Sequence, residues 1–222
     1  MKIEWIGHSC FYVTLESGKT LLFDPFADSI GYSRKNTEPS YVLVTHSHYD
    51  HASMEHIEGE YTLIDRPGVF NYEQDGIKVI GINTFHDKSQ GSQRGTNVVF
   101  VLEAEGIRLM HMGDIGYVPD EEFFEQAGKI DILMVPVGGV YTVDAKEALE
   151  ICRLAEPNII LPMHYKTMFL QMDLDPIYKF TDAAGRLYDI SRLGTSWFEI
   201  TASSMKKRPR IVVMNHSVDS YM

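Results

Sequence analysis

Short apolar runs separated by turn residues occupy the beginning of the chain. Three such runs predict strands at residues 2–6, 11–15 and 20–23. The turn Glu16-Ser17-Gly18-Lys19 between the second and third runs is short and contains a glycine, which favours a hairpin. Residues 28–40 are polar and irregular, so we expect a surface loop there.

The run 41–45 (YVLVT) has no polar face, which is typical of a strand covered on both sides. The spacing of apolar positions in 144–155, with Asp144 as N-cap, predicts a helix, and a second helix begins at Pro119. Further apolar runs predict strands at 61–64, 77–82, 97–103, 107–112, 132–136, 159–163, 196–200 and 211–214. Together these elements predict one layered α/β domain over residues 1–222, without fixing the strand order.

Composition narrows the classes of partner. The 222 residues are 44% hydrophobic and 23% charged, as in ordinary globular proteins that bury a full core. The net charge of −11 argues against nucleic acid and anionic membranes as partners, although residues 206–210 (KKRPR) form a local basic run. The chain shows neither a membrane-spanning run nor a secretory signal, and Cys10 and Cys152 suggest no disulfide framework. We therefore expect a cytoplasmic protein.

The strongest chemical signal directly follows the buried run 41–45. Three imidazoles and a carboxylate lie within six residues, at His46, His48, Asp50 and His51. Imidazole nitrogen and carboxylate oxygen are the preferred non-sulfur ligands of zinc and similar ions. In an extended backbone, His46 and His48 point to the same side, while Asp50 and His51 can turn toward a second position. The spacing suits two neighbouring metal ions better than one, and the alternative is a polar surface loop.

The pattern H-x-H-x-D-H after a hydrophobic strand resembles the signature of the metallo-β-lactamase superfamily. The resemblance implies an αββα sandwich with a metal site at the strand ends between two sheets. It also implies later ligands, for which His86, Asp114 and His164 stand at suitable strand ends. The first metal would then take His46, His48 and His86, and the second Asp50, His51 and His164. Asp114 would bridge two divalent ions, with zinc expected and manganese or iron also compatible with these donors.

Other segments resemble the branch that contains L-ascorbate-6-phosphate lactonase and uncharacterised zinc-dependent hydrolases. The resemblance covers residues 1–170 and rests on the segments 7–11 (GHSCF), 91–97 (GSQRGTN), 136–139 (PVGG) and 162–166 (PMHYK). It implies hydrolysis of a small-molecule ester or lactone, phosphorylated in some cases, by a metal-activated hydroxide. A phosphodiesterase or nuclease is one alternative. A metal-bound sensor or scaffold without turnover is another.

Several neighbouring residues are candidates for handling the substrate, which we expect to be a small anion. Asp50 could orient the attacking water or relay a proton, and His8 could act beside the metals or only pack in the core. Arg94 and Lys166 could bind an anionic group, and Tyr165 could donate to an oxyanion, although all three could be ordinary loop residues. His111 is interpreted as a packed core residue and His56 and His216 as surface residues. A homo-oligomer is compatible with the sequence.

Overall fold

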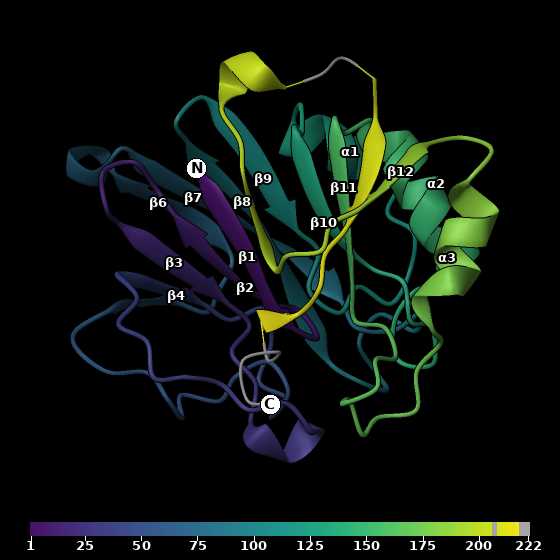
Figure 1. Ribbon diagram of the computed structural model, residues 1–222, viewed down its shortest axis with the longest axis horizontal. Coiled ribbons are helices and arrows are strands. Elements are labelled where there is room, and N and C mark those ends of the chain that lie inside the picture. The colour runs from purple at the N-terminus through teal and green to yellow at the C-terminus, as the bar shows by residue number, and fades with distance from the viewer. Residues whose placement is uncertain (206–207, 218–222) are drawn as a thin grey trace.

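The computed structural model describes residues 1–205 and 208–217. Two twisted sheets face each other, and helices cover the outer side of the larger sheet (Figure 1). The first sheet has the order β13-β1-β2-β3-β4-β5. Its strands are β1 (Lys2–Gly7), β2 (Cys10–Thr14), β3 (Thr20–Phe23), β4 (Tyr41–Leu43), β5 (Thr62–Ile64) and β13 (Trp197–Glu199). The hairpin predicted between the second and third runs is present, since β2 and β3 pair antiparallel.

The second sheet has the order β12-β14-β11-β10-β9-β8-β7-β6 and changes from antiparallel to parallel pairing at β9. Parallel pairing places the C-terminal ends of β9, β10 and β11 at the same edge. The strands are β6 (Gly68–Tyr72), β7 (Ile77–Phe85), β8 (Thr96–Ala104), β9 (Ile107–His111), β10 (Ile132–Pro136), β11 (Ile159–Met163), β12 (Asp189–Arg192) and β14 (Arg210–Val213).

The main core fills the space between the sheets. Alternate residues of β1 are buried, which places Ile3 and Trp5 in this core beside Phe11, Phe23 and Phe100. The helices α1 (Glu121–Ala127), α2 (Ala145–Ala155) and α3 (Ile177–Ala184) lie on the other face of the larger sheet. Asp144 caps α2 with a capping box, as the sequence predicted for this N-terminus.

The outer layer of the six-stranded sheet differs from the helical layer on the opposite side. Within the described residues it is formed by loops and the 3₁₀ turn η1 (Asp28–Ile30), which cover a second apolar cluster containing Leu22 and Tyr32. The prediction of a simple surface loop at 28–40 is wrong, because Ile30, Tyr32 and Arg34 are buried there. The two-sheet α/β sandwich itself is confirmed.

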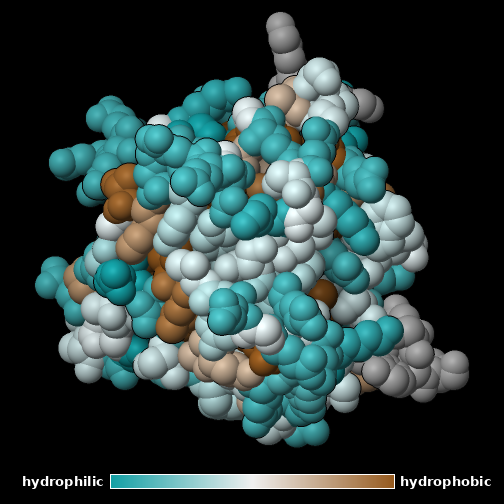
Figure 2. Space-filling model, turned by 90° about the vertical axis from the view of Figure 1, so that its left-hand side faces the viewer, coloured by the Kyte–Doolittle hydropathy of each residue, from teal (hydrophilic) through white to brown (hydrophobic). Residues whose placement is uncertain are grey.

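The sequence-based assignment missed β6, β12 and α3. It also missed the short 3₁₀ turns η2 (Glu73–Asp75) and η3 (Ala202–Ser204). Figure 2 shows the side of the molecule where β4 and β6 lie in Figure 1, with small apolar patches interrupted by hydrophilic residues. Leu63 and Val69, on the edge strands β5 and β6, are exposed. No helix in the described part of the chain is long and apolar enough to cross a membrane.

Candidate metal centre

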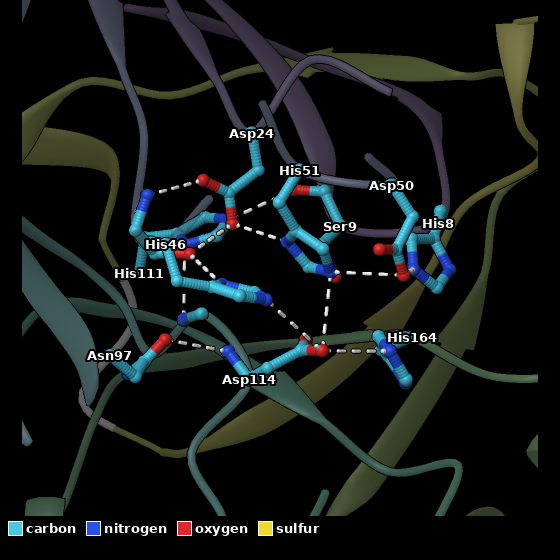
Figure 3. A network of polar contacts seen from close by, with 12 residues as sticks. His8, Ser9, Asp24, His46, Asp50, His51, Asn97, His111, Asp114 and His164 are labelled. Carbon is cyan, nitrogen blue, oxygen red and sulfur yellow. Dashed lines mark hydrogen bonds and ion pairs between the residues drawn. The ribbon is translucent and has the colours of Figure 1, made fainter. Parts of the chain in front are cut away.

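The predicted ligands meet at one edge of the sandwich, beyond the C-terminal ends of four strands (Figure 3). His46 lies three residues after β4, His86 directly after β7, Asp114 three residues after β9, and His164 directly after β11. A backbone hydrogen bond of 2.9 Å from Val98 to Thr45 ties the segment before His46 to the second sheet. The sheets are thus fastened together beside the ligands.

Asp114 is the centre of the cluster. Its Oδ2 lies 3.2 Å from Nε2 of both His51 and His164, 3.3 Å from Nε2 of His86 and 3.9 Å from Nε2 of His46. Two groups of potential ligand atoms surround it, and the atoms within each group lie within 4.8 Å of one another. One group is His46, His48 and His86, and the other is His8, Asp50, His51 and His164. The structure therefore brings together all seven predicted ligands and adds His8.

The donor atoms fit cations because several are buried and make no hydrogen bond. Nε2 of His46, His51 and His164 and Oδ1 of Asp114 make no hydrogen bond with the described residues, although the three nitrogens lie within 3.9 Å of Asp114 Oδ2. A buried polar atom without a hydrogen bond costs about 1–3 kcal/mol, and a bound cation would satisfy such atoms. Nitrogen and oxygen donors at mutual distances near 3.2 Å are spaced as they would be around an ion with bonds of about 2.0–2.2 Å. The residues present therefore fit bound metal ions.

Residues outside the predicted set hold the ligands in place. The fully buried Asp24, directly after β3, accepts from His51 Nδ1 at 2.7 Å, Thr45 Oγ1 at 2.7 Å and Thr45 N at 2.8 Å. Thr45 Oγ1 is also 3.0 Å from His46 Nδ1, so one hydroxyl links both groups. Asn97 accepts from the Asp114 amide at 2.9 Å and donates to Met112 O and Thr84 Oγ1. Sequence reasoning missed Asp24 and Asn97, whose only signal is their position at strand ends.

The turn before Asp114 requires glycine. Gly113 has φ +55°, and a Cβ there would lie 2.3 Å from Asn97 Oδ1 and 2.7 Å from Thr45 Cβ. His164 also has a positive φ, 51°, and a Cβ on Gly138 would lie 2.0 Å from the His164 carbonyl oxygen. The loops after β9, β10 and β11 therefore approach too closely for larger residues.

Burial and neighbouring charges set the protonation of the cluster. Burial lowers the pKa of His46 to about 3, so this imidazole is neutral with a free lone pair. Burial alone would raise the pKa of Asp114, but His164 and His51 hold it well below the usual value. Burial likewise opposes charge on His51, yet Asp114 and Asp24 raise its pKa well above normal. The carboxylates of Asp114 and Asp24 thus stabilise positive charge in the space between them. A bound cation would supply such a charge.

A cavity of about 450 Å³ opens onto the cluster. Its walls include His48, Asp50, His86 and Asp114 from the cluster and Ser47, Tyr49, Arg94, Tyr141 and Met172 from the surrounding loops. The Arg94 guanidinium lies over the Tyr141 ring, 4.8 Å from its centroid. The Asp87 carboxylate fixes the loop that carries Arg94 by accepting four backbone N–H bonds, from Ser89, Gly91, Gln93 and Arg94.

Tyr165 and Lys166 do not line this cavity. Tyr165 is 4% exposed, and its ring packs in the core, with its centroid 5.2 Å from that of Trp5. Lys166 Nζ donates to the carbonyl oxygens of Leu170 at 2.8 Å and Met172 at 2.7 Å. Of the two interpretations left open by the sequence, contact with substrate and a purely structural role, the geometry favours the structural role for both side chains. Lys166 instead shapes the loop that brings Met172 to the cavity.

The remaining histidines lie apart from the ligands. His111 is a buried core residue, as predicted, donating from Nε2 to Ser9 O at 2.8 Å and accepting at Nδ1 from the Gly113 amide. His56 is half-buried beside Asn36 and Asp28. The surface interpretation of His216 is incomplete, because its ring packs edge-on against Phe169 with centroids 4.9 Å apart.

The described residues of the basic run 206–210 do not line the cavity. Lys206 and Lys207 lie outside the described residues. Arg208 pairs with Asp189 at 3.2 Å. Arg210 begins β14 and is paired in parallel register with Ile159, whereas His164 follows the opposite end of β11. The described part of the run is therefore at the other end of the strands.

Comparisons with known proteins agree with this geometry. A family profile for the β-lactamase superfamily domain matches residues 2–164. A UPF0173 metal-dependent hydrolase of Thermoplasma volcanium is 31% identical over 201 residues, covering 80% of this chain and 88% of the relative. Another from Thermoplasma acidophilum is 33% identical over 195 residues, covering 77% and 85%.

Solved structures give the same result. A metallo-β-lactamase superfamily protein of Thermotoga maritima, for which zinc-dependent hydrolysis has been suggested, superposes with a TM-score of 0.78 at 37% identity. That match covers 96% of this chain and 97% of the other. An isothiocyanate hydrolase from Delia radicum gut bacteria shares the fold, with a TM-score of 0.66 at 14% identity and coverage of 91% and 100%. The chain therefore belongs to the β-lactamase superfamily, among its metal-dependent hydrolases.

Proposed function

We propose that this protein hydrolyses a small anionic ester or lactone at a centre of two divalent cations. The observation that carries the proposal is the convergence on Asp114 of buried donor atoms that make no hydrogen bond, from both ligand groups and beside an open cavity. A purely structural site is usually closed by protein ligands, whereas a catalytic site keeps an open position. This difference argues against a metal-bound scaffold.

The chain supplies two sets of donors. His46, His48 and His86 would hold the first cation, and Asp50, His51 and His164 the second, with Asp114 shared between them. Zinc suits these nitrogen and oxygen donors, and manganese or iron would also bind them. When bound, the cations would lower the pKa of a water molecule and polarise the carbonyl oxygen under attack.

Asp50 is placed to handle the attacking water. Its carboxylate belongs to the second ligand group and also lines the cavity. Burial opposes its charge, but the hydrogen bond with His8 and the neighbouring His51 hold the pKa of Asp50 below its usual value. Asp50 is therefore ionised at neutral pH and can accept a hydrogen bond from a water molecule, orienting it toward the substrate.

Arg94 is the expected contact for the anionic group of the substrate. It is the one cationic side chain among the described residues that line the cavity, and its guanidinium packs over the ring of Tyr141. A guanidinium binds carboxylate or phosphate oxygens through two parallel hydrogen bonds. Tyr49 and Met172 provide apolar contact for the rest of the molecule. A volume of about 450 Å³ accommodates a small metabolite.

Turnover of a panel of anionic esters, lactones and phosphodiesters tests this function. The protein should hydrolyse an anionic ester or lactone, lose activity on chelation and regain it when Zn²⁺ or Mn²⁺ is added. Asp114→Ala should lose nearly all turnover and at least one bound metal. Arg94→Ala should raise KM at least tenfold for an anionic ester and leave KM nearly unchanged for its neutral analogue.

Other outcomes would redirect the assignment. Turnover confined to phosphodiesters would support the phosphodiesterase alternative, and two tightly bound metals without turnover of any substrate would support a scaffold. Full activity of Asp114→Ala would contradict the proposal. A cytoplasmic location and the assembly state stay predictions.

A further inference from the structure

His8 lies where the first sheet meets the second ligand group. It forms the tight turn between β1 and β2, with φ +52°, a backbone conformation that is uncommon for a non-glycine residue. Its carbonyl oxygen accepts from the His164 amide at 3.1 Å and from Trp5 Nε1 at 3.0 Å. The surrounding chain thus holds a costly backbone conformation in place, which places the imidazole beside the ligands.

The His8 side chain is fully buried and faces the second group (Figure 3). Its Nε2 lies 3.2 Å from Asp50 Oδ2, and its ring centroid is 4.2 Å from that of His164 and 5.2 Å from that of His51. Two roles are compatible with these distances. Nε2 could bind the second cation directly, or it could carry a proton and donate it to Asp50.

The contact with Asp50 favours the second role. Nε2 of His8 and Oδ2 of Asp50 are within hydrogen-bond distance, and an ionised carboxylate only accepts, so Nε2 must carry the proton in this contact. Nδ1 of His8 is buried without a hydrogen-bond partner among the described residues, and with the proton on Nε2 it keeps only an unpaired acceptor. Nδ1 of His86 and His164 is also buried without such a partner, so the contact with Asp50, and not the state of Nδ1, distinguishes His8 from these two residues.

We propose that His8 is a positioning residue for the second cation, donating from Nε2 to Asp50 Oδ2 and so fixing this carboxylate for metal binding. The inference rests on the binuclear site proposed above and adds a residue to it. His8 does not line the cavity, whereas Asp50 does. His8 therefore supports Asp50 from the side opposite the substrate and should determine how tightly the second cation binds, without affecting the first.

Two variants of matched shape isolate the hydrogen bond. His8→Gln and His8→Met are both unbranched, are similar in length and bear the same backbone strain, but only glutamine retains an N–H donor. Stepwise titration of each metal-free protein with Zn²⁺ against a chelating dye gives the affinity of both equivalents. His8→Met should weaken the second equivalent about 10–100-fold and leave the first unchanged, because loss of an outer hydrogen bond to a ligand typically costs this much. His8→Gln should recover most of that loss.

The outcomes distinguish this inference from the proposed function. Two equivalents bound by both variants as tightly as by the unaltered protein would overturn the role of His8 and leave the binuclear site intact. Equal weakening in both variants would also overturn it, since a direct ligand would behave in that way. Uptake of one equivalent by the unaltered protein would overturn the binuclear proposal and this inference with it.

A measurement on the unaltered protein avoids dependence on variant folding. Long-range ¹H–¹⁵N NMR spectra of the zinc-loaded protein report which nitrogen of each imidazole carries the proton. We expect His8 to be protonated at Nε2. A proton on Nδ1 with Nε2 bound to zinc would overturn the proposal.

Discussion

Replacing Asp24 with asparagine should weaken the second cation without removing any metal ligand. Asp24 Oδ2 accepts from His51 Nδ1 and Thr45 Oγ1, while Oδ1 accepts from the Thr45 amide, all within 2.8 Å. An asparagine has one oxygen and one NH₂ group, so it cannot accept on both sides. If its NH₂ faces the Thr45 amide, two buried donors oppose each other.

The opposite orientation is no better. The NH₂ group would then face His51 Nδ1, which could accept only if the proton moved to Nε2, the atom aimed at Asp114. Either orientation leaves one conflict between buried groups, which costs about 1–3 kcal/mol of unfolding free energy. Loss of a carboxylate behind a metal-binding imidazole typically weakens the metal 10–100-fold, or about 1.4–2.7 kcal/mol.

Urea unfolding of the metal-free protein and zinc competition titrations would measure the two effects separately. Asp131→Asn is a suitable control because Asp131 is also buried and accepts from a backbone amide, Arg108 N at 2.9 Å, but lies outside the cluster. It should lose stability and keep both zinc affinities. If Asp24→Asn loses stability to the same extent and binds the second zinc as tightly as before, Asp24 does not support the metal-binding role of His51.

Three further predictions concern the backbone, pH and metal removal. Gly113→Ala should lower the unfolding free energy measured in urea by about 2–5 kcal/mol, because of the positive φ and the contact with Asn97. Gly18→Ala, at φ +83° in open space, should lower it by only about 1–2 kcal/mol. Equal losses would contradict a steric role for the contact with Asn97. Burial raises the pKa of Tyr32 from 10.0 to about 12, so above pH 10 the unfolded state loses this proton first and stability should fall between pH 10 and 12. Tyr32→Phe should flatten that part of the stability profile, and an unchanged slope would exclude Tyr32 as its source. Adding free zinc to the chelated protein at 100 times its Kd should raise the unfolding free energy by about 2.7 kcal/mol per site, and a Tm independent of zinc would argue against specific binding to the folded state.

Most strands and the group of candidate ligands after β4 could be predicted from the sequence because both depend on local patterns. Alternating or continuous apolar runs marked the strands that form the core, and His46, His48, Asp50 and His51 are close in the chain. The later ligands were implied by the family resemblance, which expects a ligand after each of three strands, and His86, Asp114 and His164 stand at such positions. The structure brings them to one edge because parallel strands end there together.

Features that depend on distant contacts could not be read in this way. Asp24 and Asn97 are ordinary polar residues in the sequence, and only the packing of the two sheets brings them to His51 and Asp114. The sequence left open whether Tyr165 faces the site or packs elsewhere, and the contact of its ring with Trp5, 160 residues earlier in the chain, shows that it packs in the core. The helix α3 is as amphipathic as α2, but it spans 8 residues against 11 and its N-cap, Pro176, makes no side-chain capping bond, so it lacks the start signal that Asp144 gives to α2.

Candidate ligands near strand ends and cavity residues on connecting loops can be changed separately, which matters for altering the specificity of this protein. His86, Asp114 and His164 follow strands of the larger sheet within three residues, whereas Tyr141 and Met172 reach the cavity from connecting segments away from the candidate ligands. A library that randomises Tyr141 and Met172 while keeping Gly113 and Gly138 fixed should yield many folded, metal-loaded variants with altered substrate preference. Selection from such a library can change which substrates fit the cavity while the candidate metal ligands stay the same.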